Sequence, residues 1–305
     1  MLVDRSIVNE HCYFVGETGS GKTSLGIMPL IIQLIRGFTN PSTGQPVAPH
    51  PMIILDLKGD PALFHTVRAE TEARGQKFLF FTPEKGKRTY YFNPFQSLRS
   101  ANRTITQLCE LMLDSLSLSY GEAMVAPITR GKTECCCTPP SRWTRLPTPL
   151  KSSIVDLRPF PKKTQKSMGH GPQDEEQLPK RIDAFELLST IQVLTAYPML
   201  TTVKDPAHVE AAIHMPTVLE QNQVVYFWLP AALESVSVRE IGKLALFSLL
   251  SAAIDRQAAG LPRRQAYLVI DEFQRIAGSN FKIVLEQARS FGIGAHARQP
   301  VSFGP

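Results

Sequence analysis

The stretch Gly16-Glu17-Thr18-Gly19-Ser20-Gly21-Lys22-Thr23 decides the fold expected of this chain, because it matches the phosphate-loop (Walker A) pattern G-x-x-x-x-G-K-[ST] at every fixed position. Its glycines permit a tight turn that points successive backbone N–H groups at phosphate oxygens. In such a loop the lysine, here Lys22, reaches the β- and γ-phosphates, and the hydroxyl of Thr23 holds Mg2+. All eight residues are therefore candidates for binding a nucleotide, with ATP and Mg2+ as the expected cofactors.

The sequence on either side of the loop has the character that the motif requires. The apolar residues 12–15 predict a buried strand, and residues 24–28 predict the start of a helix that runs from Gly21 to about Arg36. The positive end of that helix dipole would favour a bound phosphate. Pro29 lies inside the helix and is expected to kink it. The alternative is a glycine-rich turn that binds nothing, and the agreement of pattern and context weighs against it.

The length and composition are those of a globular protein. The chain has 305 residues, of which 43% are hydrophobic, enough for one large core or two smaller ones. The longest nearly apolar window, residues 244–254, is shorter than the roughly 20 residues that span a bilayer, so no membrane segment is expected. Five cysteines, three of them consecutive at 135–137, fit neither a disulfide framework nor a zinc site. A reducing, cytoplasmic location is the expectation.

The net charge of +6 is concentrated in one segment and therefore does not by itself indicate DNA binding. Residues 121–182 hold 11 Lys and Arg against 6 Asp and Glu, whereas the rest of the chain holds 22 against 21. From about 122 to 180 the segment is also rich in proline and has neither a helical nor a strand period, which predicts disorder. Because helical patterning stops near Tyr120 and resumes near Asp183, translation out of frame is a second hypothesis for this stretch.

Apolar segments alternate with helical ones along the rest of the chain. Strands are expected at residues 52–57, 77–82, 224–229 and 266–272, and helices at 60–74, 236–257 and 280–290, with residues 90–95 at the rim of the sheet. This alternation predicts an α/β fold with a mainly parallel sheet that helices cover on both faces.

Two further helical periods, at residues 101–118 and 183–196, predict an inserted and mainly helical region. The expected division is a phosphate-loop NTPase domain of residues 1–96 and 201–305, interrupted by an inserted region of residues 97–200. The disordered, proline-rich stretch lies within that insertion.

A second chemical feature is the strand at 266–272, which ends in Asp271 and Glu272 in the manner of a Walker B motif. We expect this strand to lie beside the loop strand, so that Asp271 is near Thr23 and holds Mg2+, while Glu272 polarises the water that attacks the γ-phosphate. Acids also mark ordinary strand ends at a surface, but the phosphate loop upstream favours the functional interpretation. The second acid favours a hydrolase over a kinase, which remains an alternative.

Arg289 stands at the end of the helix expected at 280–290. It is either an arginine finger that reaches the γ-phosphate of a neighbouring subunit or a cation favourably placed at a helix C-terminus. Physical reasoning from the sequence alone favours the second interpretation.

Five segments together resemble the TraG/TraD-type coupling proteins of conjugation and type IV secretion, relatives of the FtsK and HerA DNA pumps. They are the phosphate loop with its strand and residues 55–60 (LDLKGD), 92–94 (FNP), 268–273 (LVIDEF) and 287–292 (QARSFG). The resemblance covers roughly residues 8–118 and 183–295. It implies a RecA-like nucleotide-binding domain that carries an inserted all-helical domain, six copies of which form a ring that moves DNA by ATP hydrolysis.

The resemblance also implies roles for individual residues. The phosphate loop would bind the nucleotide, Asp271 and Glu272 would support metal and water, and Arg289 would act in trans, which makes that role the favoured one. Gln299 would sense the γ-phosphate. The implied partners are single- or double-stranded DNA, type IV secretion or relaxosome proteins, and further copies of the chain in a homo-hexamer. Family members are often tethered to the inner membrane, and no anchor is seen in this sequence.

The end of the sequence leads to a competing hypothesis. Residues 296–300, His-Ala-Arg-Gln-Pro, are expected to form a strand poorly, because proline cannot donate to a central ladder. The sheet would then have an unpaired edge beside the site. Two hypotheses follow: a coupling-protein-like ATPase that moves DNA, and a degenerate fragment that binds nucleotide without motor activity.

Overall fold

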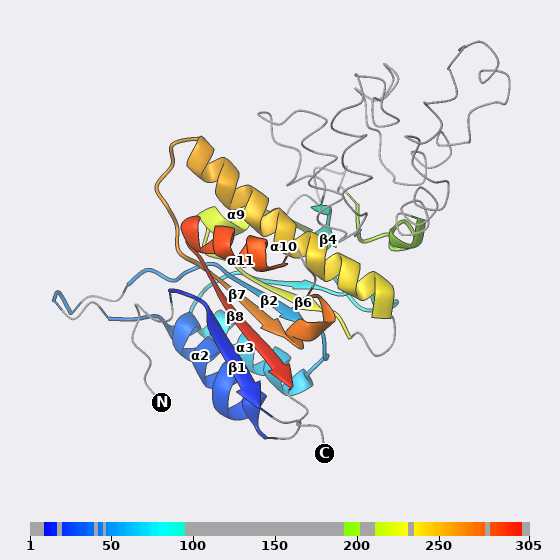
Figure 1. Ribbon diagram of the computed structural model, residues 1–305, viewed down its shortest axis with the longest axis horizontal. Helices are drawn as coiled ribbons and strands as arrows, with labels where there is room; N and C mark the ends of the chain where they lie inside the picture. The colour runs from blue at the N-terminus through cyan, green and yellow to red at the C-terminus, as the bar shows by residue number, and fades with distance from the viewer. Residues whose placement is uncertain are drawn as a thin grey trace, which may run out of the picture.

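A six-stranded parallel sheet forms the centre of the molecule, with helices on both faces (Figure 1). The computed structural model describes residues 9–16, 20–39, 42–44, 47–94, 192–201, 211–230, 235–277 and 281–300. The strand order is β1-β8-β7-β2-β6-β3, and every neighbouring pair is parallel. The predicted α/β fold, with a mainly parallel sheet flanked by helices, is thereby confirmed.

The strands predicted from apolar runs are present within one or two residues of the expected bounds. They are β1 (Cys12–Gly16), β2 (Met52–Asp56), β3 (Phe78–Phe81), β6 (Val224–Trp228) and β7 (Ala266–Asp271). The runs of β2 and β7 are buried along their whole length, as expected for strands covered on both faces.

Of the segment that was expected at the rim of the sheet, the described residues 90–94 form one backbone hydrogen bond with it and then leave it. The N–H of Tyr90 donates to the carbonyl of Phe80 in the edge strand β3, at 2.8 Å. The next residues form β4 (Tyr91–Phe92), which pairs with β5 (Ala212–Ile213) in a separate two-stranded ladder.

The prediction that residues 296–300 form a strand poorly is wrong. They belong to β8 (Ile293–Pro300), which lies between β1 and β7 and pairs with both. Pro300 is the last residue of β8 and lies opposite Gly16, so its missing N–H affects only the end of the ladder. The glycine before the strand, Gly292, has φ 85°, and a Cβ there would lie 2.7 Å from the carbonyl of Arg264, which no side chain permits.

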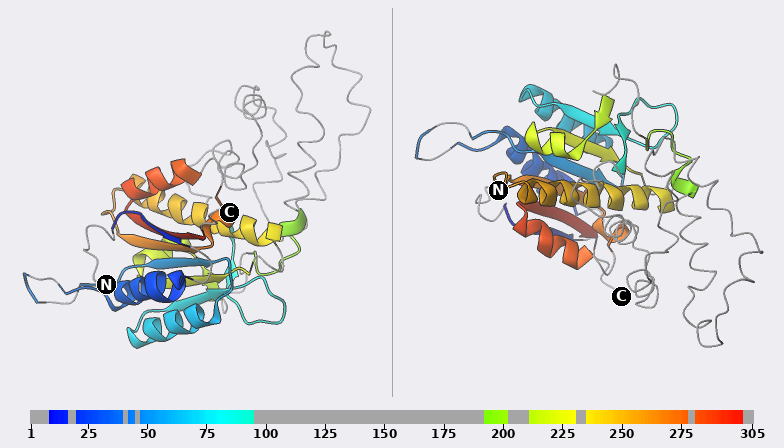
Figure 2. Two further views of the ribbon diagram at one scale, coloured as in Figure 1. Left: turned by 60° about the horizontal axis from the view of Figure 1, so that its bottom comes forward. Right: turned by 90° about the horizontal axis from the view of Figure 1, so that it is seen from above.

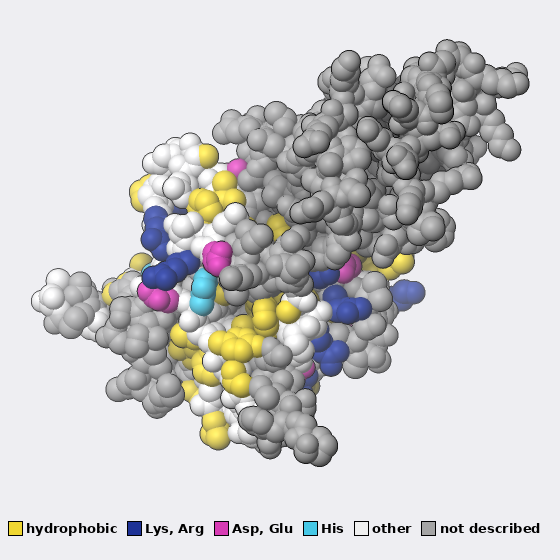
Figure 3. All heavy atoms as spheres, viewed as in Figure 1, with side chains coloured by type: hydrophobic (Ala, Val, Ile, Leu, Met, Phe, Trp, Pro, Cys, Tyr) yellow, Lys and Arg dark blue, Asp and Glu magenta, His cyan; other side chains and the backbone are white. Residues whose placement is uncertain are grey.

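The position of β8 also corrects the expectation that the Asp271 strand lies directly beside the loop strand, since one strand separates β7 from β1. Among the described residues β1 has a strand partner only on its β8 side. Its side chains Tyr13 and Val15 are 51% and 55% exposed. Figure 3 shows hydrophobic side chains gathered over the position that β1 has in Figure 1.

The helices form one layer on each face of the sheet (Figure 2). One face is covered by α2 (Met28–Arg36) and α3 (Pro61–Ala73). The other is covered by α9 (Met215–Glu220), α10 (Ser235–Ala258) and α11 (Phe281–Ser290). Alternate residues of each strand enter the two resulting cores: Ile54 packs with α2 and α3, and its neighbours Ile53 and Leu55 pack on the α10 side.

The helix after the phosphate loop changes type just before Pro29. Its first part is the π-helical η1 (Lys22–Ile27), closed by a bond from the N–H of Met28 to the carbonyl of Thr23. The second part, α2, has Pro29 in its first turn, the part of an α-helix that tolerates proline best. The change of helix type therefore lies at the position where the sequence predicts that proline disturbs the helix.

Most of the predicted insertion lies outside the described residues, including the helix at 101–118, the proline-rich stretch at about 122–180 and most of the helix at 183–196. The domain bounds and the out-of-frame hypothesis therefore stay predictions. Within the described residues 192–201, Leu194 and Leu200 pack in the core on the α10 side. The N–H of Phe92 donates to the carbonyl of Met199 at 2.9 Å, so the end of this region is joined to the sheet domain. No described helix is both long and apolar enough to cross a bilayer.

Candidate nucleotide-binding site

The phosphate loop lies where β1 ends and η1 begins, in the predicted strand, loop and helix order. Gly21 has φ 75°, a left-handed conformation that glycine adopts at little cost and that turns the chain into η1. The Nζ of Lys22 donates to the carbonyl of Gly16 at 2.5 Å and to the hydroxyl of Ser20 at 3.4 Å. The lysine thus folds back over the loop. Glu17, Thr18 and Gly19 lie outside the described residues.

The two acids stand at the same end of the sheet as the loop. Asp271 is the last residue of β7 and is fully buried. Glu272 follows it with φ 58°, an uncommon conformation for a residue with a side chain, which turns the chain into the short helix η6 (Phe273–Arg275). Such local strain persists where the surrounding structure fixes it, often at functional sites.

Arg298 of β8 joins the loop to the acids. Its guanidinium donates through Nη1 to the Thr23 hydroxyl and through Nη2 to Glu272 Oε1, the latter at 2.9 Å. Its Nε forms an ion pair with Asp271 that lacks the geometry of a hydrogen bond. The Arg298 side chain is only 6% exposed. One buried cation thus contacts the residues that were predicted to hold metal and water.

Glu272 has further partners on its second oxygen. The side-chain amide of Gln274 donates to Oε2 at 2.5 Å, and Arg275 lies 3.6 Å from the same atom. The carboxylate is therefore held from both sides, by Arg298 on one oxygen and by the η6 residues on the other.

Burial raises the pKa of Asp271 to about 6. The positive charge of Arg298 acts in the opposite direction, while the neighbouring carboxylates of Asp56 and Glu272 add to the increase. Asp56 lies directly opposite Asp271, at the end of β2. Two buried carboxylates thus stand side by side at the carboxyl edge of the sheet.

Asp56 organises the turn between β2 and α3. Its Oδ1 accepts the N–H groups of Lys58 and Gly59 at 3.1 and 2.8 Å, and its Oδ2 accepts the N–H of Asp60 at 2.8 Å. The hydroxyl of Tyr226 donates to Oδ2 at 2.7 Å. Burial raises the pKa of Asp56, and these hydrogen bonds act against the increase. Because its carboxylate accepts four hydrogen bonds from the protein, we infer that Asp56 stabilises the shape of the site and does not bind a ligand.

The residues at this edge fit a nucleotide-bound Mg2+. The hydroxyl of Thr23 and the carboxylate of Asp271 are near enough for one guanidinium to contact both. Both Asp271 oxygens are buried without a hydrogen bond of ordinary geometry among the described residues. Hydroxyl and carboxylate oxygens are ligands that Mg2+ prefers, with the remainder supplied by phosphate and water. The described residues contain no cluster of three or more His, Cys, Asp or Glu that could hold a metal ion without a nucleotide.

The other two residues proposed for catalysis lie apart from each other. The backbone of Gln299 is opposite Val15, near the phosphate loop. Arg289 is at the end of α11, before β8 begins, and therefore at the other edge of the sheet. It forms an exposed ion pair with Glu10, at 2.7 Å. The eight residues of β8 are joined by steps of about 3.3 Å, so the strand spans roughly 23 Å and separates Arg289 from the loop of its own chain.

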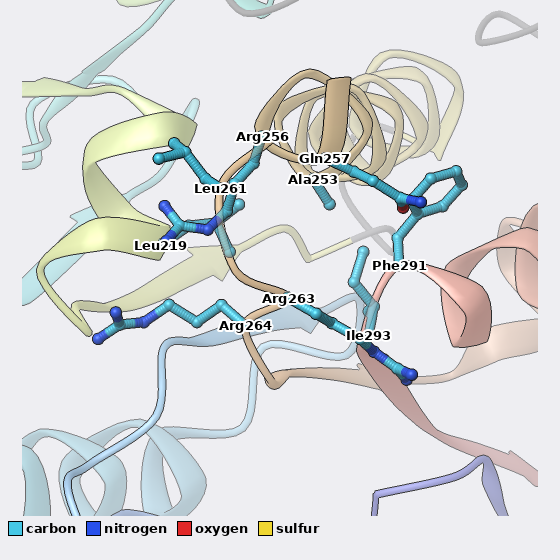
Figure 4. Close-up of a pocket in the computed structure, with 9 residues that line it drawn as sticks. All are labelled: Leu219, Ala253, Arg256, Gln257, Leu261, Arg263, Arg264, Phe291 and Ile293. Atoms are coloured by element: carbon cyan, nitrogen blue, oxygen red, sulfur yellow. The ribbon is translucent and has the colours of Figure 1, made fainter. Parts of the chain in front are cut away.

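A pocket lies at the same edge as Arg289 (Figure 4). It is lined by residues of α9, α10, the following connection and the start of β8, among them Arg256, Arg263 and Arg264. All three arginines have partners within the protein. Arg256 donates to the carbonyl of Pro262, and Arg263 donates to the carbonyl of Arg289. Arg264 donates to the side chain of Asn222. This pocket is separate from the phosphate loop and takes no part in the nucleotide site.

The fold and the place of the loop define an α/β protein with a phosphate-loop arrangement. Solved structures to which the chain is similar include those of the bacterial conjugative coupling protein TrwB. With the unbound monoclinic form of TrwBdeltaN70 the identity is 17% over 97% of this chain and 63% of that one, with a TM-score of 0.47. With the trigonal form in complex with sulphate the identity is 17% over 97% of this chain and 65% of that one, with a TM-score of 0.45.

A third structure, of the plasmid coupling protein TrwB in complex with ADP and Mg2+, has 15% identity over 93% of this chain and 71% of that one, with a TM-score of 0.33. The chain spans less than two thirds of the first two. No family model matches the chain, and no curated protein does. Similarity at this level concerns the course of the chain and not the role of any residue.

Sequence reasoning missed Arg298 and gave no role to Asp56 or Tyr226. Arg298 belongs to a segment that was expected to form a strand poorly, so the sequence did not indicate its proximity to Thr23 and Asp271. A signal was nevertheless present, because a polar residue near the carboxyl end of a strand in a phosphate-loop sheet points toward the site. Asp56 had a comparable signal, as a carboxylate that ends an otherwise apolar run.

Proposed function

We propose that this chain is a phosphate-loop ATPase module in which Lys22 and Thr23 bind the nucleotide and Asp271 and Glu272 support its hydrolysis. One observation carries the proposal: Thr23 of the loop and the acids at the end of β7 meet through one side chain, although β8 separates their strands. Residues some 250 positions apart in sequence thus form one polar site.

The chemistry follows from the type and place of each group. Backbone N–H groups of the loop and the start of η1 would bind phosphate oxygens, and Lys22 would exchange its contact with Gly16 for the β- and γ-phosphates. Thr23 and Asp271 would hold Mg2+, which neutralises charge on the phosphates when bound. Glu272 would orient the attacking water and accept its proton.

The finer proposal is that hydrolysis drives the movement of DNA, as a coupling protein does in conjugation or type IV secretion. Its support is the spaced set of sequence motifs that resemble TraG/TraD-type proteins, of which the phosphate loop and the 268–273 segment lie at the site. In this proposal the working form is a homo-hexamer in the cytoplasm that joins secretion or relaxosome proteins through regions other than the site.

The test is ATP hydrolysis by the purified chain with and without single- and double-stranded DNA. We expect hydrolysis that DNA stimulates, and its loss in both Lys22→Ala and Glu272→Gln. The two variants separate binding from chemistry, because only Lys22→Ala should also weaken ADP binding. Wild-type protein that binds no ADP would overturn the proposed function as a whole, and ADP binding without hydrolysis under any DNA condition would overturn the motor.

A second candidate, nucleotide binding without turnover, is favoured by the contacts of Glu272. Both of its oxygens already accept hydrogen bonds from protein donors, which compete with a water molecule for this carboxylate. This candidate predicts the same ADP affinity for wild type and Glu272→Gln and no hydrolysis by either. A kinase has no comparable support, since no observation points to a bound acceptor.

A further inference from the structure

Arg298 lies between the two residues that are predicted to hold a metal ion at this site. Its guanidinium touches Thr23 and Asp271, the predicted metal-binding pair, and also Glu272. Asp271 is fully buried, and an unpaired carboxylate there would be costly. The guanidinium of Arg298 supplies the compensating positive charge from within the chain.

We propose that Arg298 is an internal cation that fills the metal position of the nucleotide-free site, and that a divalent metal ion binds there only by displacing it. This inference deepens the proposed function and rests on it for the identity of the site. Two cations cannot share the space between Thr23 and Asp271, because both would need the same oxygens and would repel each other at close range. The site therefore has two alternative occupants.

The displacement would also change Glu272. The same guanidinium that pairs with Asp271 donates to Glu272 Oε1 at 2.9 Å. When it leaves Asp271 its contact with Glu272 is no longer fixed, and that oxygen becomes open to water. Arg298 is thus a positioning residue that holds the water-polarising acid inactive until metal arrives, which limits hydrolysis to the fully loaded site.

Arg275 provides a matched comparison on the same acid. It lies 3.6 Å from Glu272 Oε2 and is 40% exposed in its side chain. Within the part of the chain that the structure describes, Arg275 forms no hydrogen bond or ion pair with Thr23 or Asp271, whereas Arg298 contacts both. Replacing either arginine removes one positive charge from the neighbourhood of Glu272, but only the Arg298 change empties the metal position.

The experiment measures metal binding without nucleotide, with Mn2+ as the probe because it shares the oxygen preference of Mg2+ and is counted by electron paramagnetic resonance. Arg298→Gln should bind Mn2+ about tenfold more tightly than wild type. Arg275→Gln should bind it as wild type does, and adding Asp271→Asn to Arg298→Gln should abolish the gain. Equal affinity in wild type and Arg298→Gln, or the same gain in Arg275→Gln, would overturn the inference.

Two additions keep the result decisive. If Arg298→Gln does not fold, Arg298→Lys retains the charge but replaces the planar fork of the guanidinium by one compact ammonium group. It should therefore hold the three partners less well and show a smaller gain in Mn2+ affinity; no gain would overturn the inference. ADP binding to wild type is measured in parallel. Absence of ADP binding would overturn the proposed function. The Mn2+ affinities test the role of Arg298 independently of that result.

Discussion

Three polar residues are buried on the neighbouring central strands β2, β7 and β8, and each avoids the cost of burial in its own way. Asp271 is paired with Arg298, so the two charges compensate each other. Asp56 is satisfied by three backbone N–H groups and by Tyr226. His296 has no hydrogen-bond partner for either ring nitrogen among the described residues and remains neutral.

His296 should make stability depend on pH. Burial, with a smaller effect from the charge of His11, lowers the pKa of His296 from 6.5 to about 4. Between those values the unfolded chain binds a proton that the folded chain does not, so His296 lowers stability as the pH falls from 6.5 to 4. The full effect is about 3 kcal/mol, at 1.36 kcal/mol for each pH unit.

The measurement compares urea unfolding of wild type and His296→Leu at several pH values. The free energy of unfolding of wild type relative to the variant should fall by about 3 kcal/mol from pH 7.5 to pH 4. Asp271 contributes with the opposite sign, because its pKa is raised and its stabilisation is lost as the pH rises through about 6, but it is present in both proteins and cancels. A difference that does not change with pH would contradict the prediction.

The candidate site was foreseeable where chemistry restricts the residue type. Lys22, Thr23, Asp271 and Glu272 follow from what a phosphate, a metal ion and a water molecule need, and the structure brings them to one edge of the sheet. Arg298 was not foreseeable, because its role depends on which strand lies between β1 and β7. That information is a property of tertiary pairing and not of the local sequence.

At the scale of elements, the sequence predicted best the strands that are buried on both faces. Continuous apolar runs such as those of β2 and β7 have no other stable place than the middle of a sheet. β8 was missed because it contains His296, Arg298 and a terminal proline, which suggest an exposed segment. It is nevertheless central, because the pairings with β1 and β7 and the ion pair of Arg298 compensate for its polar content.

The N-terminus of α3 depends on Asp60. Its side chain accepts the N–H groups of Ala62 and Leu63 at 3.0 and 3.3 Å, and Pro61 occupies the first helical position. Asp60→Ala should therefore lower the free energy of unfolding by about 1 kcal/mol, measured by urea denaturation. Asp60→Asn keeps an acceptor and should retain most of the stability. An equal loss in both variants would mean that charge, and not capping, is what the position supplies.

At the scale of the whole molecule, the parallel sheet separates two edges with different contents. The carboxyl edge holds the phosphate loop, Arg298 and the acids, whereas the amino edge holds Arg289 and its partner Glu10. The class of fold was predictable from the alternation of strands and helices, but the strand order was not, because periodicity does not say which strands are neighbours. The distance between the edges excludes direct contact of Arg289 with the nucleotide of its own chain.

Arg289 should therefore act on a neighbouring subunit or not at all. If it acts in trans, Arg289→Ala should bind ADP as wild type does and hydrolyse ATP about a thousandfold more slowly. Mixing it with Lys22→Ala should restore part of the activity, because an intact phosphate loop in one subunit can then face an intact Arg289 in the next. Glu10→Gln is the control, since it removes the surface ion pair and keeps the arginine. Normal hydrolysis by Arg289→Ala would instead mean that Arg289 has no catalytic role and serves as a cation that stabilises the C-terminus of α11.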